Sequence, residues 1–310
     1  MPHVQENTVW VLLPIHNRRD TTLTFVERLL AQTHSCWRLL LLDDGSDDGS
    51  ADAVLKLVPQ ASVLRGDGTW WWAGALHHGY RWIKRHANNK DDVVLIINDD
   101  TEIEAEFLKN GVAALRPRSL LLAQQYTAAD RRLVEVGATI DWRKFTHNTT
   151  LKQNFVNCQP TRGLFLRVKD FFEIGGFHPI LLPHYQSDYE FTMRARRMGF
   201  ELASDPTVRL FYDEAKTGVD NLESASLLQR LRIAFSKRYK LNPLYLTAFV
   251  LLACPAAYKL LNIMRVWKSF FREVVFCDAF AVESSNAIPQ CIGHVVGSPL
   301  PSHDVLGKLK

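Results

Sequence analysis

The sequence predicts an α/β fold in which a mainly parallel β-sheet is covered by helices on both faces. Three short apolar segments, at 8–13, 37–42 and 93–97, are separated by stretches with helical spacing. Strands that are apolar along their whole length are buried on both sides, and parallel strands need crossover connections, which are usually helices. Polar clusters directly follow these three segments, as expected where ligands bind at the carboxyl ends of parallel strands.

The predicted elements alternate along the first third of the chain and become less regular afterwards. Strands are expected at 8–13, 37–42, 62–64, 93–97, 133–140 and 163–168, and helices at 22–31, from about 50, at 71–86 and at 187–198. Gly199 suits the left-handed position that follows a helix C-terminus. Right-handed crossovers then place the carboxyl ends of the parallel strands at one edge of the sheet.

Length and charge limit the classes of function. The 310 residues are enough for one large domain, or for one domain with an appendage. The formal charge of +4 is too small to indicate a nucleic-acid partner. Five dispersed cysteines without a CxxC pair and a polar N-terminus without signal-peptide features lead us to expect the cytoplasm. We expect a main domain at 1–220, a helical segment at 221–282 and a mobile tail at 283–310.

The cluster Asn98-Asp99-Asp100 follows the predicted strand at 93–97 and is the strongest chemical signal. Mg²⁺ and Mn²⁺ prefer oxygen ligands, and they often take only one or two protein carboxylates together with substrate phosphates. Adjacent carboxylates repel each other unless a cation or hydrogen-bond donors compensate. The alternative interpretation is a turn that caps the next helix.

Two other acidic segments are candidates for ligand contacts. Asp43 and Asp44 directly follow the second strand, where they could accept hydrogen bonds from a base or a ribose. The segment from Ser187 to Glu190 matches a capping box, with Ser187 as N-cap and Glu190 reaching back to it. A capping box does not require Asp188, whose carboxylate could instead accept a proton from an attacking hydroxyl.

Two apolar features remain. Three consecutive tryptophans, Trp70 to Trp72, cannot all face a core, so at least one is expected to line a groove. The stretch 241–258 carries no charge, is shortened as a helix by Pro243 and Pro255, and is flanked by Lys and Arg. It could lie on an anionic membrane surface, cover the main domain, form a dimer contact or, at the lower length limit, span a membrane.

With these residues identified, the sequence resembles family-2 glycosyltransferases with the GT-A fold, over about residues 9–212. The glycine-rich segment with its tryptophans is similar to bacterial rhamnosyltransferase-like enzymes of surface-polysaccharide synthesis. The ordered landmarks are Pro14 and Asn17, Leu41–Ser50, Gly66–Gly68 with Gly74, Ala75 and Gly79, Leu95–Asp100, Arg162–Leu166, Glu173–Phe177, and Ser187–Phe191 with Arg194 and Gly199.

The resemblance implies a GT-A, Rossmann-like catalytic domain with a role for each matching residue. Nucleotide-sugar contacts would come from Pro14, Asn17, Asp43, Asp44, Asp67 and Asp99. Asp100 would hold Mg²⁺ or Mn²⁺, because Asn98-Asp99-Asp100 stands at the DxD position. Asp188 would be the catalytic base, and Trp71, Trp72, Gly163 and Glu190 would line the acceptor groove.

The implied reaction is inverting, metal-dependent transfer of a hexosyl or deoxyhexosyl group from a UDP- or dTDP-sugar to a hydroxyl of a glycan or lipid-linked acceptor. The expected place is the cytoplasmic face of the membrane. Asn98 replaces the first Asp of DxD, and no His follows the last core strand, where Asp213 could replace it. These departures motivate the alternative of a non-catalytic nucleotide-sugar-binding or scaffolding relative. A dinucleotide-dependent oxidoreductase is disfavoured, because no GxGxxG follows the first strand.

Overall fold

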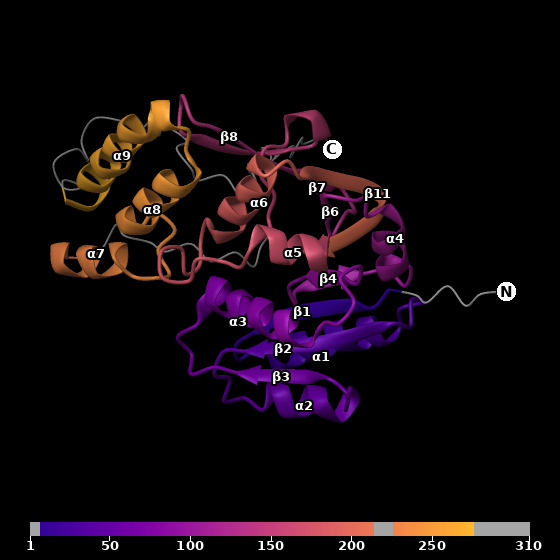
Figure 1. The fold of residues 1–310 in the computed structure, drawn as a ribbon. Coiled ribbons are helices and arrows are strands. Elements are labelled where there is room, and N and C mark those ends of the chain that lie inside the picture. The colour runs from indigo at the N-terminus through magenta and orange to yellow at the C-terminus, as the bar shows by residue number, and fades with distance from the viewer. Residues whose placement is uncertain (1–6, 214–225, 276–310) are drawn as a thin grey trace, which may run out of the picture.

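The computed structural model describes residues 7–213 and 226–275. Its centre is a nine-stranded mixed sheet with the strand order β3-β2-β1-β4-β10-β6-β11-β5, with β7 paired to β6 (Figure 1). The strands of this sheet are β1 (Val9–Ile15), β2 (Trp37–Asp43), β3 (Ser62–Arg65), β4 (Val93–Ile96), β5 (Thr101–Ile103), β6 (Ser119–Thr127), β7 (Leu133–Glu135), β10 (Leu164–Arg167) and β11 (Glu201–Tyr212). A separate hairpin joins β8 (Gly137–Asp141) and β9 (Thr146–Thr150).

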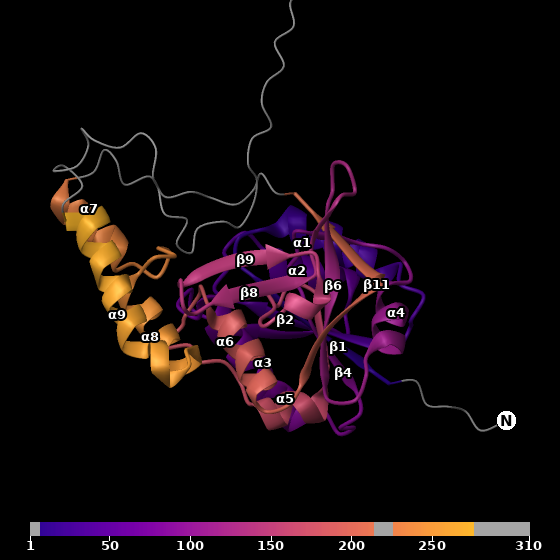
Figure 2. The same ribbon diagram turned by 90° about the horizontal axis from the view of Figure 1, so that it is seen from above.

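Helices cover both faces of the sheet, as the sequence predicts (Figures 1 and 2). One face carries α1 (Arg19–Leu30), α2 (Ser50–Leu57) and α4 (Phe107–Ala114). The other carries α3 (Trp71–His86), α5 (Val168–Ile174) and α6 (Ser187–Arg197). A third group, α7 (Leu227–Ala234), α8 (Pro243–Ala253) and α9 (Ala256–Phe270), lies beside the sheet and is followed by a π-helical turn at Phe271–Val275.

The central position of strand β1 in the sheet explains why its sequence is continuously apolar. Val9, Val11 and Leu13 belong to the core under α1 and α2, whereas Trp10 and Leu12 belong to the core under α3. Alternate side chains of a strand point to opposite faces, so a central strand with two covered faces needs apolar residues at every position.

The sheet is mainly parallel, and one edge collects the polar clusters. Strands β1, β2, β3 and β4 are parallel neighbours, and β6 is parallel to β11. Only β5, β7 and β10 run against them. In the register, Ile15 lies opposite Asp43, and Thr101 lies opposite Tyr212. The loops after β1, β2 and β4 therefore lie on the edge that is typical of ligand sites in such sheets.

The structure corrects the sequence prediction at several elements. The single strand expected at 133–140 is wrong: it is split into β7 and β8, and Gly137 lies between them in a backbone conformation (φ 147°) that other residues rarely adopt. Strands β5, β6, β9 and β11 and helices α4 and α5 are not among the elements predicted with residue ranges. Gly199 has φ 84° after the end of α6, as predicted.

Helices α8 and α9 replace the single apolar stretch. The side chain of Asn242 accepts hydrogen bonds from the backbone N–H of Leu244 (3.0 Å) and Tyr245 (3.4 Å), and Pro243 occupies the first turn of α8. The helix ends at Cys254, directly before Pro255, as a proline in this position favours. Within residues 7–213 and 226–275, no helix is both long and apolar enough to cross a bilayer. The predicted tail at 283–310 and the domain boundary at 220–221 lie outside the described residues.

Candidate active site

The loop after β2 is organised by the carboxylate of Asp44. Its Oδ1 accepts hydrogen bonds from the backbone N–H of Gly68 (2.9 Å) and Trp70 (3.1 Å), and its Oδ2 accepts one from Trp71 (2.8 Å). At Gly66, a Cβ atom would lie 2.7 Å from Asp44 Oδ1, so only glycine allows this approach. Asp44 thus fixes the segment 66–71 beside the carboxyl end of β2.

Asp43, Asn17 and Pro14 surround the same edge. Asp43 is 1% exposed and accepts a hydrogen bond from the Ser46 backbone N–H at 2.9 Å. Asn17 has φ 49°, and its Oδ1 accepts a hydrogen bond from the Asp47 backbone N–H at 2.9 Å, which ties the loops after β1 and β2 together. Pro14 lies within β1, beyond the end of β4, where a residue without an N–H is tolerated.

Asp67 and the tryptophans lie at the mouth of this region. Asp67 is exposed, and its pKa is lowered chiefly by the hydrogen bond from the Thr69 hydroxyl. Trp72 donates from Nε1 to Thr161 Oγ1 at 3.3 Å and packs, like Trp70, against the core under α3. Trp71 instead lies with its ring 5.7 Å from that of His184. Of the three indoles, Trp71 is the one that does not pack against this core, and its place in a groove stays a prediction.

Arg18 and Thr22 of the α1 region hold the turn after β4. Arg18 forms ion pairs with Asp99 at 3.1 Å and with Asp100 at 3.3 Å. The hydroxyl of Thr22 donates to Asp99 Oδ2 at 2.8 Å. Burial raises the pKa of Asp99, while Arg18 and Thr22 oppose that shift. One guanidinium thus compensates two adjacent carboxylates.

The same turn has oxygen atoms suited to a hard cation. Asn98 Oδ1 and Asp100 Oδ1 are buried and have no hydrogen-bond partner. Such orphaned acceptors are costly unless a ligand satisfies them. Within the described ranges, no group of three His, Cys, Asp or Glu could hold a metal by itself. Residues 98 and 100 therefore fit a metal that also takes donor phosphates as ligands.

Asp188 lies at the start of α6, where the charge of Arg162 acts on it and its own charge acts on Glu135. Its Oδ1 accepts a hydrogen bond from the Tyr189 backbone N–H at 2.9 Å. Burial raises the pKa of Asp188 to about 6, against the favourable charge of Arg162. Burial raises the pKa of Glu135 to about 8, and the negative charge of Asp188 adds to that shift. Glu135 Oε1 is buried without a hydrogen-bond partner, so this carboxyl group is poorly solvated.

Arg162 lies between the residues around Asp188 and the strand that follows Asp100. Its guanidinium lies 4.3 Å from the centre of the Tyr212 ring, and Tyr212 is the register partner of Thr101, the residue after Asp100. Arg162 thus links Asp188, whose pKa it lowers, to the pairing of β11 with β5, the strand that begins directly after Asp100.

The predicted capping box at Ser187 is wrong. The N-cap of α6 is Gln186, with φ 67°, and the Ser187 hydroxyl donates to the carbonyl of His184. Glu190 is 1% exposed, and Arg194 binds its carboxylate through two hydrogen bonds of 3.0 Å each. A buried carboxylate is stabilised more by a bidentate arginine than by a hydrogen bond to a helix N-terminus, so Glu190 pairs with Arg194.

Gly163 and Asp213 complete the predicted residues. Gly163 has φ 79°, and a Cβ atom there would lie 2.4 Å from Leu210 Cδ2, so the position requires glycine for packing as well as for backbone conformation. Asp213 is exposed at the end of β11.

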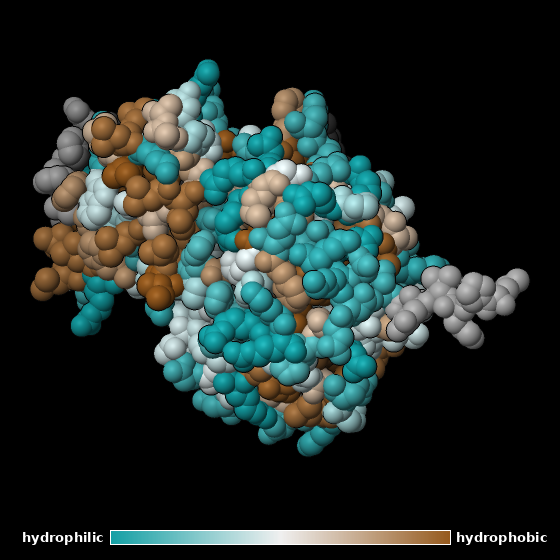
Figure 3. All heavy atoms as spheres, viewed as in Figure 1, coloured by the Kyte–Doolittle hydropathy of each residue, from teal (hydrophilic) through white to brown (hydrophobic). Residues whose placement is uncertain are grey.

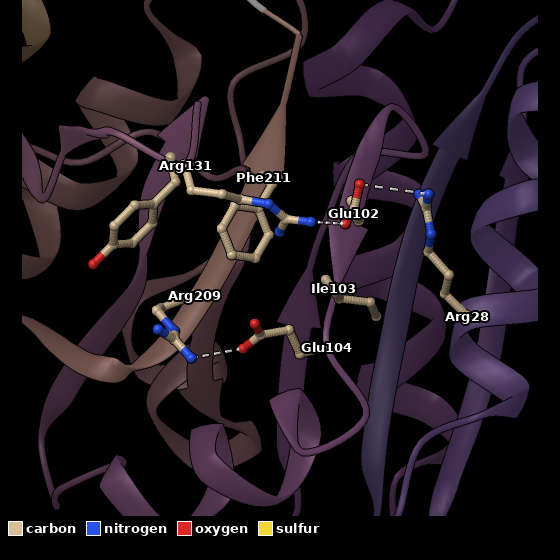
Figure 4. Close-up of a pocket in the computed structure, with 8 residues that line it drawn as sticks. Arg28, Glu102, Ile103, Glu104, Arg131, Arg209 and Phe211 are labelled. Carbon is tan, nitrogen blue, oxygen red and sulfur yellow. Dashed lines mark hydrogen bonds and ion pairs between the residues drawn. The ribbon is translucent and has the colours of Figure 1, made fainter. Parts of the chain in front are cut away.

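A separate cavity of about 380 Å³ lies at the β5 edge of the sheet (Figure 4). Its charged side chains face one another as ion pairs: Arg131 and Arg28 contact Glu102 at 2.6 and 3.7 Å, and Arg209 contacts Glu104 at 2.9 Å. None of the predicted site residues lines it.

Four contributors were given no role by sequence reasoning: Arg18, Thr22, Glu135 and Arg162. Arg18 follows Asn17 directly, and Arg162 precedes Gly163, so proximity to predicted residues was an available signal for both. Thr22 and Glu135 come close to Asp99 and Asp188 only in the folded chain, so no local sequence pattern identifies them.

Comparisons with known proteins agree with this geometry. The family model described as Glycosyl transferase family 2 matches residues 10–172, more than half of the chain. No curated protein matches the sequence significantly.

Three solved structures have a similar fold. Mannosyltransferase PcManGT from Pyrobaculum calidifontis, in complex with GDP-Man and Mn²⁺, matches with a TM-score of 0.54 and 16% identity, over 91% of this chain and 77% of that one. GalNAc-T7 with UDP, GalNAc and Mn²⁺ gives 0.58 and 14%, over 90% and 58%. S. aureus TarS 1-349 in complex with UDP-GlcNAc gives 0.51 and 15%, over 90% and 76%. At these identities the similarity establishes the fold, which confirms the predicted GT-A class. The family match, on a sheet whose carboxyl edge gathers the acidic loops, shows that the chain belongs to glycosyl transferase family 2.

Proposed function

We propose that the protein transfers a sugar, with inversion, from a UDP- or dTDP-sugar to a hydroxyl of a glycan or lipid-linked acceptor in surface-polysaccharide synthesis. The observation that supports this proposal is that Arg162, which acts on the raised pKa of Asp188, also stacks on Tyr212, the register partner of the residue that follows Asp100. The donor complexes of PcManGT and TarS support a nucleotide-sugar donor.

On the donor side, the described contacts suggest how the chain would hold the nucleotide sugar. Asp44 fixes segment 66–71, and the Thr22 hydroxyl holds the carboxylate of Asp99 within the turn at 98–100. Asn98 and Asp100 would hold Mg²⁺ or Mn²⁺, which when bound neutralises charge on the leaving diphosphate. Arg18, which is partly exposed beside both aspartates, adds a second positive charge near the same phosphates.

On the acceptor side, Asp188 would act as the base. The acceptor oxygen forms a bond to the anomeric carbon while the bond from that carbon to the diphosphate oxygen breaks, and the acceptor proton passes to Asp188. A pKa of about 6 leaves Asp188 ionised at neutral pH, yet makes it a stronger base than an ordinary aspartate. A lipid-linked acceptor would present its hydroxyl at a membrane surface, which places the reaction beside the cytoplasmic face of the membrane.

The second candidate is a nucleotide-sugar-binding relative without transfer activity. The specific observation in its favour is Asn98 at the first DxD position, which removes one negative charge from the metal site. Both candidates bind a donor, so they differ only in turnover.

Donor binding is tested by thermal-shift measurements with UDP-, dTDP- and GDP-sugars, with and without Mn²⁺. A ligand that binds the folded state raises the melting temperature. We expect a metal-dependent rise with one nucleotide class, lost in Asp100→Asn and kept in Asp91→Asn. Asp91 is a matched control because it is exposed at the opposite edge of the sheet, before β4.

Turnover is tested by release of nucleoside diphosphate from the donor that binds. We expect release by the wild type and loss of release, with retained donor binding, in Asp188→Asn. Donor binding without release by the wild type, with glycan and lipid-linked acceptors supplied, favours the nucleotide-sugar-binding relative without transfer activity. Absence of a thermal shift with every donor contradicts both candidates.

A further inference from the structure

The helices α7, α8 and α9 expose an unusual amount of apolar surface. Figure 3 shows apolar residues gathered over these helices, in contrast to the largely polar surface of the rest of this view. Exposure reaches 80% at Leu228 and 72% at Leu260. We call the set formed by Leu228, Leu244, Leu251, Leu260, Met264 and Phe271, each more than 40% exposed, the C-terminal apolar face. Patches of this kind mark interaction or membrane sites.

The buried sides of α8 and α9 already supply the local core. Phe249 of α8 packs against Trp142, with ring centres 5.5 Å apart, and Val266 of α9 is 4% exposed. Leu260, Met264 and Phe271 recur at spacings of four and seven residues, which places them on one stripe of α9 and its continuation. Among the described residues, these outward side chains are therefore not part of the packed core.

The charge around this face is strongly one-sided. Residues 226–275 contain nine Lys and Arg and a single acidic residue, Glu273. Lys259 and Arg265 donate hydrogen bonds to backbone carbonyl oxygens, of Leu251 (2.7 Å) and Arg143 (2.7 Å), so those contacts leave their charge without a carboxylate. Lys240 and Lys268 are exposed. An apolar face bordered by cations is typical of helices that lie in the headgroup region of an anionic bilayer.

Direct contacts hold this face in a defined position relative to the site. Arg143 Nε donates to the Tyr258 hydroxyl at 3.1 Å, and Arg197 donates to the carbonyl of Leu252 at 2.9 Å. Lys237 donates to the carbonyl of Thr69 at 3.3 Å, in the segment that Asp44 fixes. The helices are thus attached both to the β8–β9 hairpin and to the predicted donor loop.

We propose that the C-terminal apolar face docks this protein on the surface of a membrane rich in anionic phospholipids. A second copy of the chain is a poorer occupant, because pairing two such faces brings like charges together. The proposal concerns the partner of the helices and does not depend on the transfer reaction; only a lipid-linked acceptor links the two.

The test is vesicle flotation of the full chain without donor or metal, with vesicles of phosphatidylcholine alone or of an equal mixture with phosphatidylglycerol. We expect binding to the mixture that weakens as salt rises, and at least about tenfold weaker binding to phosphatidylcholine alone. Lys240→Glu combined with Lys268→Glu, and separately Leu260→Gln combined with Met264→Gln, should each weaken binding at least about tenfold.

The matched control is Lys56→Glu combined with Leu57→Gln, two exposed residues of α2 on the far side of the sheet, which should leave binding unchanged. All variants alter exposed positions, and circular dichroism checks that they fold. Equal binding to both vesicle types, or binding that neither test variant weakens, overturns the proposal. If the protein does not bind vesicles but forms a dimer, and if the dimer dissociates in the variant with Leu260→Gln and Met264→Gln, the face is a contact between copies and the proposal is wrong. If vesicle binding appears only after removal of residues 276–310, that segment is what covers the C-terminal apolar face, and this outcome also overturns the proposal.

Discussion

Glu135 gives the sharpest test of the electrostatics of the site. Glu135 is 5% exposed, and burial raises the pKa of its carboxyl group to about 8 from an ordinary value of 4.5. Glu135→Gln keeps the shape of the side chain and removes its ionisation. The substitution therefore isolates the cost of keeping a proton on this group in the folded protein.

The sign and size follow from proton linkage. Above pH 4.5 the unfolded chain releases the proton that the folded protein retains, so wild-type stability falls as pH rises from about 4.5 to about 8. At about 1.4 kcal/mol for each pH unit, the loss between pH 4 and pH 7 is about 3 kcal/mol. Glu135→Gln avoids that loss. Between pH 4 and pH 7, the difference in the free energy of unfolding between the variant and the wild type should thus change by about 3 kcal/mol in favour of the variant, whatever that difference is at pH 4.

The assay is urea unfolding of both proteins at pH 4, 5.5, 7 and 8.5. Glu201→Gln, on an exposed glutamate at the start of β11, is the control and should run parallel to the wild type. Parallel curves for Glu135→Gln, with a change below about 1 kcal/mol, would refute the argument that burial keeps this group protonated.

Three further outcomes are expected. Gly163→Ala should destabilise the protein by about 2–4 kcal/mol in urea unfolding, because the new Cβ meets Leu210 at 2.4 Å and the backbone is left-handed; normal stability would contradict the packing argument. Thr22→Val should cost about 1–3 kcal/mol and weaken donor binding, because Asp99 loses its 2.8 Å hydrogen bond; thermal unfolding with and without donor measures both. If Asp188 is the base, transfer should fall about tenfold from pH 7 to pH 5, because its ionised fraction falls through a pKa of about 6, and a pH-independent rate speaks against that role.

The sequence predicted the parts of the fold in which local pattern and burial agree. The strands β1 and β4, and β2 over 39–42, are apolar because both faces are covered, and α3 was predicted with its observed bounds, 71–86. Strand β5 was missed because its three residues, Thr101–Ile103, form a strand only through pairing with distant β11. Such pairing is a tertiary effect that no local propensity contains.

The site shows the same division. The turn at 98–100 was predicted because strand ends can be read from the sequence. The partners that set its charge could not be, since Arg18 and Thr22 are about 80 residues away in the chain. Glu190 illustrates the opposite error, since a local capping pattern was present, but burial and Arg194 gave that carboxylate a different partner.

The three hydrogen bonds to Asp44 have a consequence for mutational studies of the donor site. Helix α3 begins at Trp71, and its N-cap Trp70 provides no side-chain acceptor, so Asp44, from another loop, satisfies the first amides of that helix. An exposed helix terminus with free N–H groups is less stable. Substitution of Asp44 would fray α3 and loosen the loop at once. Lost nucleotide affinity in an Asp44 variant therefore cannot be assigned to a missing base contact unless hydrogen exchange shows that the first turn of α3 has kept its protection.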